Sequence, residues 1–289
     1  ITVLEVEPGE VPETGDGHGG ALNSEGGGRL TITNSHFERN LSSDDGGALA
    51  LHGSGPTVFA DSKVVNNQAK CDECSGGGIE YSGMRGTFER LFVKGNKATT
   101  GNGGGIHNTG SDVLTILDSH VEGNTALNGG GLAIQSDAPI EVDGSLFLNN
   151  RAQTGRDAAG LILEDSGRGG GIFSISDSGS IIKNSTISGN LAKVAGGGLH
   201  PDADGELRLV HLTIWKNSAP LGGGVSAVES DFVPTIPPQP HSSLFVKNSI
   251  IGGSLEGGSC DWFLTTEGGN VDTGKTCFLE ATAAMAVNP

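Results

Sequence analysis

The chain has 289 residues, among them 50 glycines, and its 34 acidic and 17 basic residues give a formal net charge of -17. Glycine does not recur at every third position, which excludes collagen, and an acidic surface repels the phosphates of nucleic acids and of anionic membranes. No apolar run approaches the roughly 20 residues that span a bilayer, so we expect no membrane insertion by this segment.

The first predicted element is a repeated glycine block, made of two glycines, a third Gly or Ala and one aliphatic residue. Five of the seven intervals between blocks are 26 or 27 residues, and the other two are longer. A fixed period of this length is typical of solenoids. The blocks begin at Gly19, Gly46, Gly76, Gly103, Gly129, Gly169, Gly196 and Gly222.

Between the blocks the chain repeats a short β run that ends in Asn, as in LTITNSHFERN at residues 30–40. Alternating apolar residues without a helical period predict strands. One such repeat cannot bury its apolar face alone, but stacked copies can. We therefore predict an all-β fold, a single right-handed parallel β-helix of about eight or nine coils.

The recurring Asn residues are predicted to form a ladder at one corner of the coil, each side chain pointing inward. Each amide would bond to backbone groups and to the next Asn along the stack. Asn108, by contrast, is expected to be exposed. The ladder positions are Asn40, Asn67, Asn96, Asn124, Asn150, Asn190 and Asn217.

Two long intervals and the tail define the domain organisation. The β-helix is expected over residues 1–253, with inserted loops at about 151–168 and 227–241, the second containing four prolines that forbid a central strand. Long insertions on a regular scaffold often carry function. Residues 254–289 are expected to cap the last coil.

The cysteines fall into two local pairs, Cys71/Cys74 and Cys260/Cys277. A zinc site would need all four to converge, and a linear stack separates the pairs by several coils. We therefore expect two local disulfides, formed in an oxidising compartment.

Candidate chemistry is sparse. Stacking makes Glu80 and His107 neighbours about 5 Å apart at the backbone, with Tyr81 beside them as a sugar-stacking ring; the alternative is a solvated face without catalysis. Asp202, Asp204 and Glu206 could hold Ca²⁺ with loop carbonyls, or form a plain acidic turn. No other cofactor is predicted.

The motifs resemble the repeats of bacterial surface β-helix proteins, notably the polymorphic outer-membrane protein family. GGAL stands at residues 19–22 and 46–49, and Phe-x-x-Asn at Phe37–Asn40 and Phe147–Asn150. The ending GGNVDTGKTCFLEATAAMAVNP is similar to the close of many secreted bacterial β-helix proteins. The resemblance implies secretion and adhesion.

Together these features predict an extracellular or cell-surface protein, acting as an adhesin, as a glycan- or protein-binding module or as a structural spacer. The alternative is a carbohydrate-active enzyme, a polysaccharide lyase or glycoside hydrolase, because parallel β-helices also carry such activities. The expected partners are a glycan or a surface protein.

Overall fold

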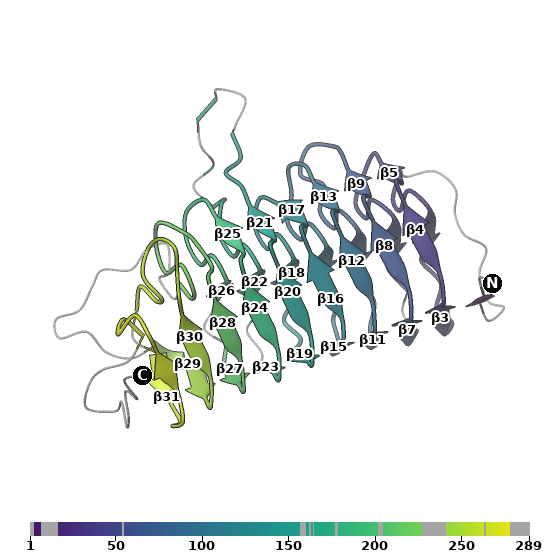
Figure 1. The fold of residues 1–289 in the computed structure, drawn as a ribbon. Helices are drawn as coiled ribbons and strands as arrows, with labels where there is room; N and C mark the ends of the chain where they lie inside the picture. The colour runs from purple at the N-terminus through teal and green to yellow at the C-terminus, as the bar shows by residue number, and fades with distance from the viewer. Residues whose placement is uncertain are drawn as a thin grey trace.

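The computed structural model describes residues 3–6, 17–53, 55–156, 160–161, 163, 165–176, 179–201, 205–226, 241–262 and 264–277. Within these residues every regular element is a β-strand, and the coils stack along one axis (Figure 1). The strands form four sheets, here called A to D, that run along the stack. The predicted all-β parallel solenoid is therefore confirmed.

Each regular coil contributes one strand to each sheet. Sheet A contains β1 (Val3–Val6), β3 (Leu30–Thr33), β7 (Thr57–Ala60), β11 (Gly86–Glu89), β15 (Leu114–Leu117), β19 (Ile140–Asp143), β23 (Ser180–Lys183), β27 (Leu207–Val210), β29 (His241–Lys247) and β31 (Leu264–Thr266). Sheet B contains β2 (Leu22–Ser24), β6 (Leu49–Leu51), β10 (Ile79–Tyr81), β14 (Ile106–Asn108), β18 (Leu132–Gln135), β22 (Ile172–Ile175) and β26 (Leu199–Pro201).

The other two sheets follow the same order. Sheet C contains β4 (His36–Glu38), β8 (Lys63–Val65), β12 (Phe92–Lys94), β16 (His120–Glu122), β20 (Leu146–Leu148), β24 (Thr186–Ser188), β28 (Thr213–Trp215), β30 (Ile250–Gly252) and β32 (Val271–Asp272). Sheet D contains β5 (Leu41–Ser42), β9 (Gln68–Ala69), β13 (Lys97–Ala98), β17 (Thr125–Ala126), β21 (Arg151–Ala152) and β25 (Leu191–Ala192).

The stack has about seven regular turns in the described part of the chain, one for each strand of sheet B. Neighbouring strands pair in parallel, as β10 does with β14, and the exception is β1, which pairs with β3 antiparallel. At the other end, β31 and β32 add further strands to sheets A and C, so stacking continues past residue 253. Residues 227–240 and 278–289 lie outside the described residues.

The core consists of aligned apolar columns, because equivalent residues of successive coils lie about 4.8 Å apart. In sheet A, Ile32, Phe59, Phe88, Ile116 and Val142 follow one another in register, and each is at most 1% exposed. The rings of Phe59 and Phe88 meet edge to face with centroids 5.8 Å apart. Only 4% of the residues are aromatic, so most of the buried apolar surface comes from such stacked aliphatic residues, with a few phenylalanines among them.

The predicted Asn ladder is confirmed and forms the corner between sheets C and D. Asn124 Oδ1 accepts from the backbone N–H and the Nδ2 of Asn96, at 2.8 and 3.0 Å. Asn124 Nδ2 donates in turn to Asn150 Oδ1 and to the carbonyl of Val93, both at 3.0 Å. The six ladder residues from Asn67 onward are at most 1% exposed. Asn40, at the N-terminal end of the ladder, is half-buried.

A second ladder, built from serine, runs along the corner between sheets A and C. Ser145 Oγ accepts from the backbone N–H of Ser119 at 3.1 Å and donates to the carbonyl of Asp143 at 3.0 Å. The residue before the serine has positive φ, as Asp118 does at 46°. Asn and Asp tolerate this left-handed conformation, and this explains why Asn or Asp precedes Ser at residues 34–35, 61–62, 118–119, 184–185 and 248–249. The serine rungs are Ser62, Ser119, Ser145, Ser185 and Ser249.

The glycine blocks form the corner that leads into sheet B. Gly103 has φ +66°, and a Cβ there would lie 2.4 Å from the carbonyl oxygen of Ile106. Gly105 lies against the ladder, where a Cβ would come within 3.1 Å of Asn124 Nδ2. The first glycine is therefore required by backbone conformation, and at Gly105 the neighbouring coil approaches too closely for a larger residue, whereas two N-terminal blocks have Ala at this place.

Candidate functional site

The candidate acid/base pair lies on the outer side of sheet B, on β10 and β14. Glu80 and His107 are direct partners in the parallel register, as the repeat predicted. The Nδ1 of His107 lies 2.6 Å from Oε2 of Glu80. On the other side of the ring, Nε2 lies 2.7 Å from Oε1 of Gln135 on β18.

Both ring nitrogens of His107 therefore face oxygen acceptors. The Gln135 oxygen also accepts from Nδ2 of Asn102 at 2.8 Å, which supports its assignment as an acceptor. A ring that donates from both nitrogens is an imidazolium. Burial opposes this charge, but the charge and hydrogen bond of Glu80, together with Gln135, outweigh it and raise the pKa of His107.

The predicted exposure of this pair to solvent is wrong. Glu80 is 4% and His107 6% exposed, so the pair forms neither a solvated face nor an accessible catalytic pair. Tyr81 is fully buried in the core, where its hydroxyl donates to the carbonyl of Met84 at 2.8 Å; burial raises the pKa of this hydroxyl to about 12. Because Ile79 and Tyr81 are two residues apart on one strand, both point inward, and Tyr81 cannot stack on a sugar.

Asn108 is also buried rather than exposed, because it lies on the inward face of β14 beyond Ile106. Its Oδ1 accepts from the backbone N–H of Gly110 at 3.2 Å. It is therefore unsuitable as the exposed reference position that the sequence indicated.

A chain of amides connects His107 to a hollow beside sheet B. Beyond Gln135 and Asn102, Oδ1 of Asn102 accepts from Nδ2 of Asn128 at 3.1 Å. Asn128 Nδ2 also donates to the carbonyl of Asp165 at 2.7 Å, and Asn128 Oδ1 accepts from the backbone N–H of Arg168 at 2.9 Å. Asn128 thus fastens the end of the inserted segment to the regular coil.

The hollow has a volume of about 420 Å³ and lies where the loops between sheets D and B meet the insertion. Its walls combine acids, amides and hydroxyls with two leucines, and its residues come from the loops of three successive coils and from the insertion that follows them. Sequence analysis missed this site, although it flagged the insertion that closes it. The lining residues are Glu73, Ser75, Thr100, Gly101, Asn102, Leu127, Asn128, Leu163, Asp165 and Ser166.

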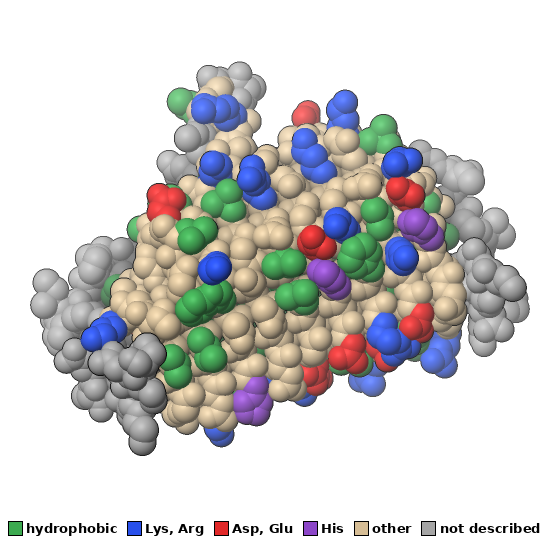
Figure 2. Space-filling model, in the orientation of Figure 1, with side chains coloured by type: hydrophobic (Ala, Val, Ile, Leu, Met, Phe, Trp, Pro, Cys, Tyr) green, Lys and Arg blue, Asp and Glu red, His purple; other side chains and the backbone are tan. Residues whose placement is uncertain are grey.

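The outer face of sheet C differs from the hollow in the side chains that it presents. Figure 2 shows single charged side chains there, interspersed with small groups of hydrophobic ones. Phe92 and Trp215 on this face are half-buried.

The predicted calcium site at Asp202, Asp204 and Glu206 is not tested by the described residues and stays a prediction. Asp202 and Asp204 lie outside the described residues. Glu206 is exposed, and its Oε1 lies 3.3 Å from Nη1 of Arg208. The residues around Glu206 therefore provide a surface ion pair of small energetic weight.

Both expected disulfides are present. Cys71 bonds to Cys74, and Cys260 bonds to Cys277. The pairs lie in different coils, so the four sulfurs do not converge on one metal. The second pair is buried, with both cysteines at most 4% exposed.

His200 lies further along the same outward column as His107, but the pKa of its ring is shifted in the opposite direction. It is 1% exposed, and its ring stacks on Phe173 with centroids 5.9 Å apart. Burial, assisted by the positive charge of Arg168, lowers the pKa of His200 to about 3. Neither ring nitrogen has a hydrogen-bond partner in the described part of the chain, so His200 is a neutral packing residue.

The fold agrees with the comparison against protein families. The family model described as the right-handed β-helix region matches residues 20–232. The chain belongs to this family, and the match confirms the predicted hand of the coil. Searches of curated proteins and of solved structures found no match.

Proposed function

We propose that the chain is an extracellular or cell-surface β-helix protein that binds a glycan in the hollow beside sheet B. One observation carries this proposal: Leu163, Asp165 and Ser166 of the insertion close a hollow with polar and apolar walls over three coils of an otherwise regular stack. A solenoid presents its binding surface where loops of successive repeats line up, and insertions concentrate on that side.

The lining suits a neutral sugar better than an ionic or purely apolar ligand. Carboxylates such as Glu73 accept hydrogen bonds from sugar hydroxyls, while amides such as Asn102 and Asn128 both donate and accept. Leu127 and Leu163 offer apolar surface for the C–H face of a ring. A few placed polar groups beside apolar surface are the usual make-up of a small-ligand site.

Surface display is supported by two separate features. Two disulfides are typical of oxidising compartments outside the cytosol. The GGAL and Phe-x-x-Asn repeats resemble those of the bacterial polymorphic outer-membrane proteins, for which adhesion is expected. Among the described residues there is no helix long and apolar enough to cross a membrane.

An enzymatic role, as a polysaccharide lyase or glycoside hydrolase, is the second candidate. The close contact of Glu80 with His107 favours it, because paired acid/base groups transfer protons. However, both groups are buried and their hydrogen bonds are directed at protein atoms. We therefore assign them a supporting role, in which they fix Gln135 and through it the amides of the hollow.

A glycan array with the purified chain tests the proposal. We expect binding to a restricted set of neutral glycans, and Glu73→Gln should weaken this binding at least tenfold. Asp72→Asn is the matched control, because Asp72 is the exposed neighbour of Glu73 and does not line the hollow. Equal loss in both variants, or binding only to proteins, would contradict the assignment.

The same glycans separate binding from catalysis. We propose that the bound glycan is released unchanged and that no cofactor is needed. Product formation that is abolished by Glu80→Gln in a chain that still folds would establish the enzyme instead. Loss of binding on addition of a calcium chelator would assign Ca²⁺ a role.

A further inference from the structure

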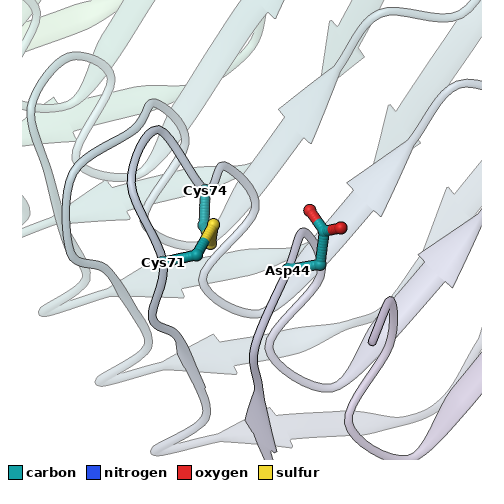
Figure 3. Close-up of side chains that lie close together, drawn as sticks. All are labelled: Asp44, Cys71 and Cys74. Carbon is teal, nitrogen blue, oxygen red and sulfur yellow. A yellow bond between two sulfur atoms is a disulfide. The ribbon is translucent and has the colours of Figure 1, made fainter. Parts of the chain in front are cut away.

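A second group of side chains lies on the loops before sheet B, apart from the Glu80–His107 pair. The carboxylate of Asp44 and the sulfurs of Cys71 and Cys74 lie within 4.8 Å of one another. Figure 3 shows Asp44 on the loop of the adjacent coil, facing the disulfide. Asp44 and Asp45 also place one ligand atom each within 4.8 Å of His18, which lies on the loop before β2.

Asp44 is held ready by its own turn. Its backbone N–H donates to Ser42 Oγ at 3.1 Å, and its Oδ1 accepts from the backbone N–H of Asp45 at 2.9 Å. This leaves Oδ2, which lies 3.5 Å from Nε2 of His18. Capping one carboxylate oxygen and leaving the other free is how neighbouring groups orient a metal ligand.

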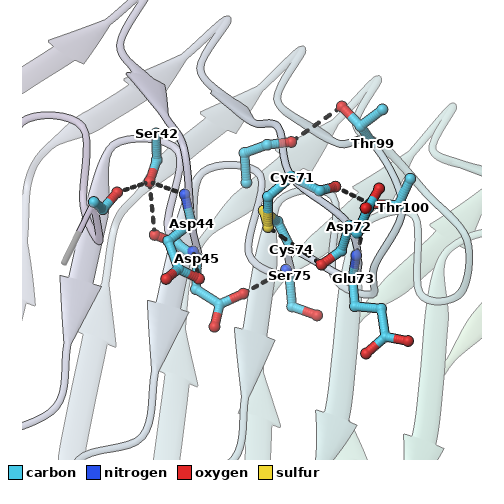
Figure 4. The surroundings of a disulfide bond; sticks show 12 residues. Ser42, Asp44, Asp45, Cys71, Asp72, Glu73, Cys74, Ser75, Thr99 and Thr100 are labelled. Carbon is cyan, nitrogen blue, oxygen red and sulfur yellow. Dashed lines mark hydrogen bonds between the residues drawn. A yellow bond between two sulfur atoms is a disulfide. The ribbon is translucent and has the colours of Figure 1, made fainter.

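The cysteine loop is anchored by contacts that do not depend on its sulfur–sulfur bond, as Figure 4 shows. Thr100 Oγ1 donates to the carbonyl of Cys71 and accepts from the backbone N–H of Glu73. Asp45 Oδ1 accepts from the backbone N–H of Ser75 at 2.6 Å, which ties the two loops together. The loops therefore stay in place when the disulfide is opened.

We propose that Cys71 and Cys74, once reduced, bind a zinc ion together with Asp44 and His18. Two thiolates, one carboxylate and one imidazole are a ligand set that Zn²⁺ takes in tetrahedral sites. Such a site separates its ligand atoms by roughly 3.3–3.8 Å. The Asp44 carboxylate and the two sulfurs already lie within 4.8 Å of one another, and His18 lies beside Asp44, with its Nε2 3.5 Å from Asp44 Oδ2. The disulfide is thus the empty, oxidised state of a redox-gated metal site.

The chemistry balances with a dithiol as the reductant. The dithiol transfers two electrons and two protons to the Cys71–Cys74 disulfide, the sulfur–sulfur bond breaks, and the dithiol closes to its own disulfide. Zinc binding then releases the two thiol protons to water. The zinc cation itself stabilises the thiolate form of both ligating cysteines.

Accessibility makes the reduction selective. Cys71 is partly exposed and is followed by exposed Asp72 and Glu73, so a dithiol can reach it. The Cys260–Cys277 pair is buried and is expected to remain oxidised under native conditions. The second disulfide therefore serves as an internal control.

The test is a metal titration of the folded chain after mild reduction with dithiothreitol and anaerobic removal of the reductant. Alkylation should then find two free thiols, at Cys71 and Cys74. We expect one Co²⁺ per chain, with thiolate-to-cobalt charge-transfer absorption, displaced by Zn²⁺; the oxidised chain should show neither. Asp44→Asn should weaken binding at least tenfold, and the matched Asp72→Asn should leave it unchanged.

Three results would overturn the proposal. They are a reduced chain that binds no Co²⁺ or unfolds, a bound Co²⁺ without thiolate absorption, and an Asp44→Asn variant that binds as tightly as the parent. Since glycan binding is measured on the oxidised chain, failure of the metal site and failure of the hollow are distinguished.

Discussion

Replacing Asn124 with Leu tests the ladder in the middle of the stack. The change keeps a similar side-chain volume but removes four hydrogen bonds: two from Asn96, one to Asn150 and one to the carbonyl of Val93. Asn96 Nδ2 and Asn150 Oδ1 keep other partners, but the buried N–H of Asn96 loses its acceptor. A stranded buried group costs about 1–3 kcal/mol, so we expect destabilisation of about 2–3 kcal/mol in urea unfolding, with faster amide exchange at Asn96.

Asn40→Leu is the matched control at the N-terminal end of the ladder. Asn40 donates its backbone N–H and its Nδ2 to Asn67 Oδ1, and a Leu there removes only the second bond. Because Asn40 is half-buried, water can replace the hydrogen bond that the Leu side chain cannot make. We expect a cost of less than about 1 kcal/mol. Equal effects of the two substitutions would refute the reasoning that the interior rungs are satisfied only by each other.

Three further outcomes are expected. The pKa of His107 is raised in the folded chain, so its stabilising effect is complete below the ordinary pKa of about 6.5 and is lost as the pH rises through the pKa of the folded chain. The free energy of unfolding in urea, measured against pH, should show this decline in the parent and not in His107→Gln. Gly103→Ala should cost about 2–4 kcal/mol of stability and Gly123→Ala only about 1–2 kcal/mol. Both glycines have φ near +65°, but only at Gly103 would the new Cβ clash with a backbone oxygen, 2.4 Å away. Similar losses of stability in the two variants, measured by thermal or urea unfolding, would contradict this. Replacing Cys260 and Cys277 with Ser opens a link that spans 17 residues and should cost about 3 kcal/mol, whereas unchanged stability would show that the link does not restrain the unfolded chain.

The fold could be predicted because its determinants repeat. The Asn ladder followed from one residue type at one place in each coil, and the register brought Glu80 next to His107. The serine ladder is less regular, because Leu91 and Leu212 take the place of Ser in two coils, and its signal is divided between the serine and the preceding residue with positive φ, as at Asp118–Ser119. A short-range dipeptide was read as part of a strand instead of as a corner.

The site was harder to predict because periodicity gives the direction of a side chain and not what covers it. The alternation along β10 was sufficient to place Tyr81 in the core with Ile79, but the sequence did not reveal that Glu80 would be closed off from solvent. The hollow depends on how the non-repeating insertion folds back, through Asn128 and Asp165, onto the coil. Such contacts have no counterpart in the other repeats, so no pattern encodes them.

Hydrogen exchange of the chain with and without its best glycan from the array is the most direct test of the proposed function. The account predicts protection confined to the loops at residues 71–75, 99–102 and 126–128 and to the insertion at 163–166, where the hollow lies. Protection over sheet C instead, or a glycan that binds without protecting these loops, would contradict it.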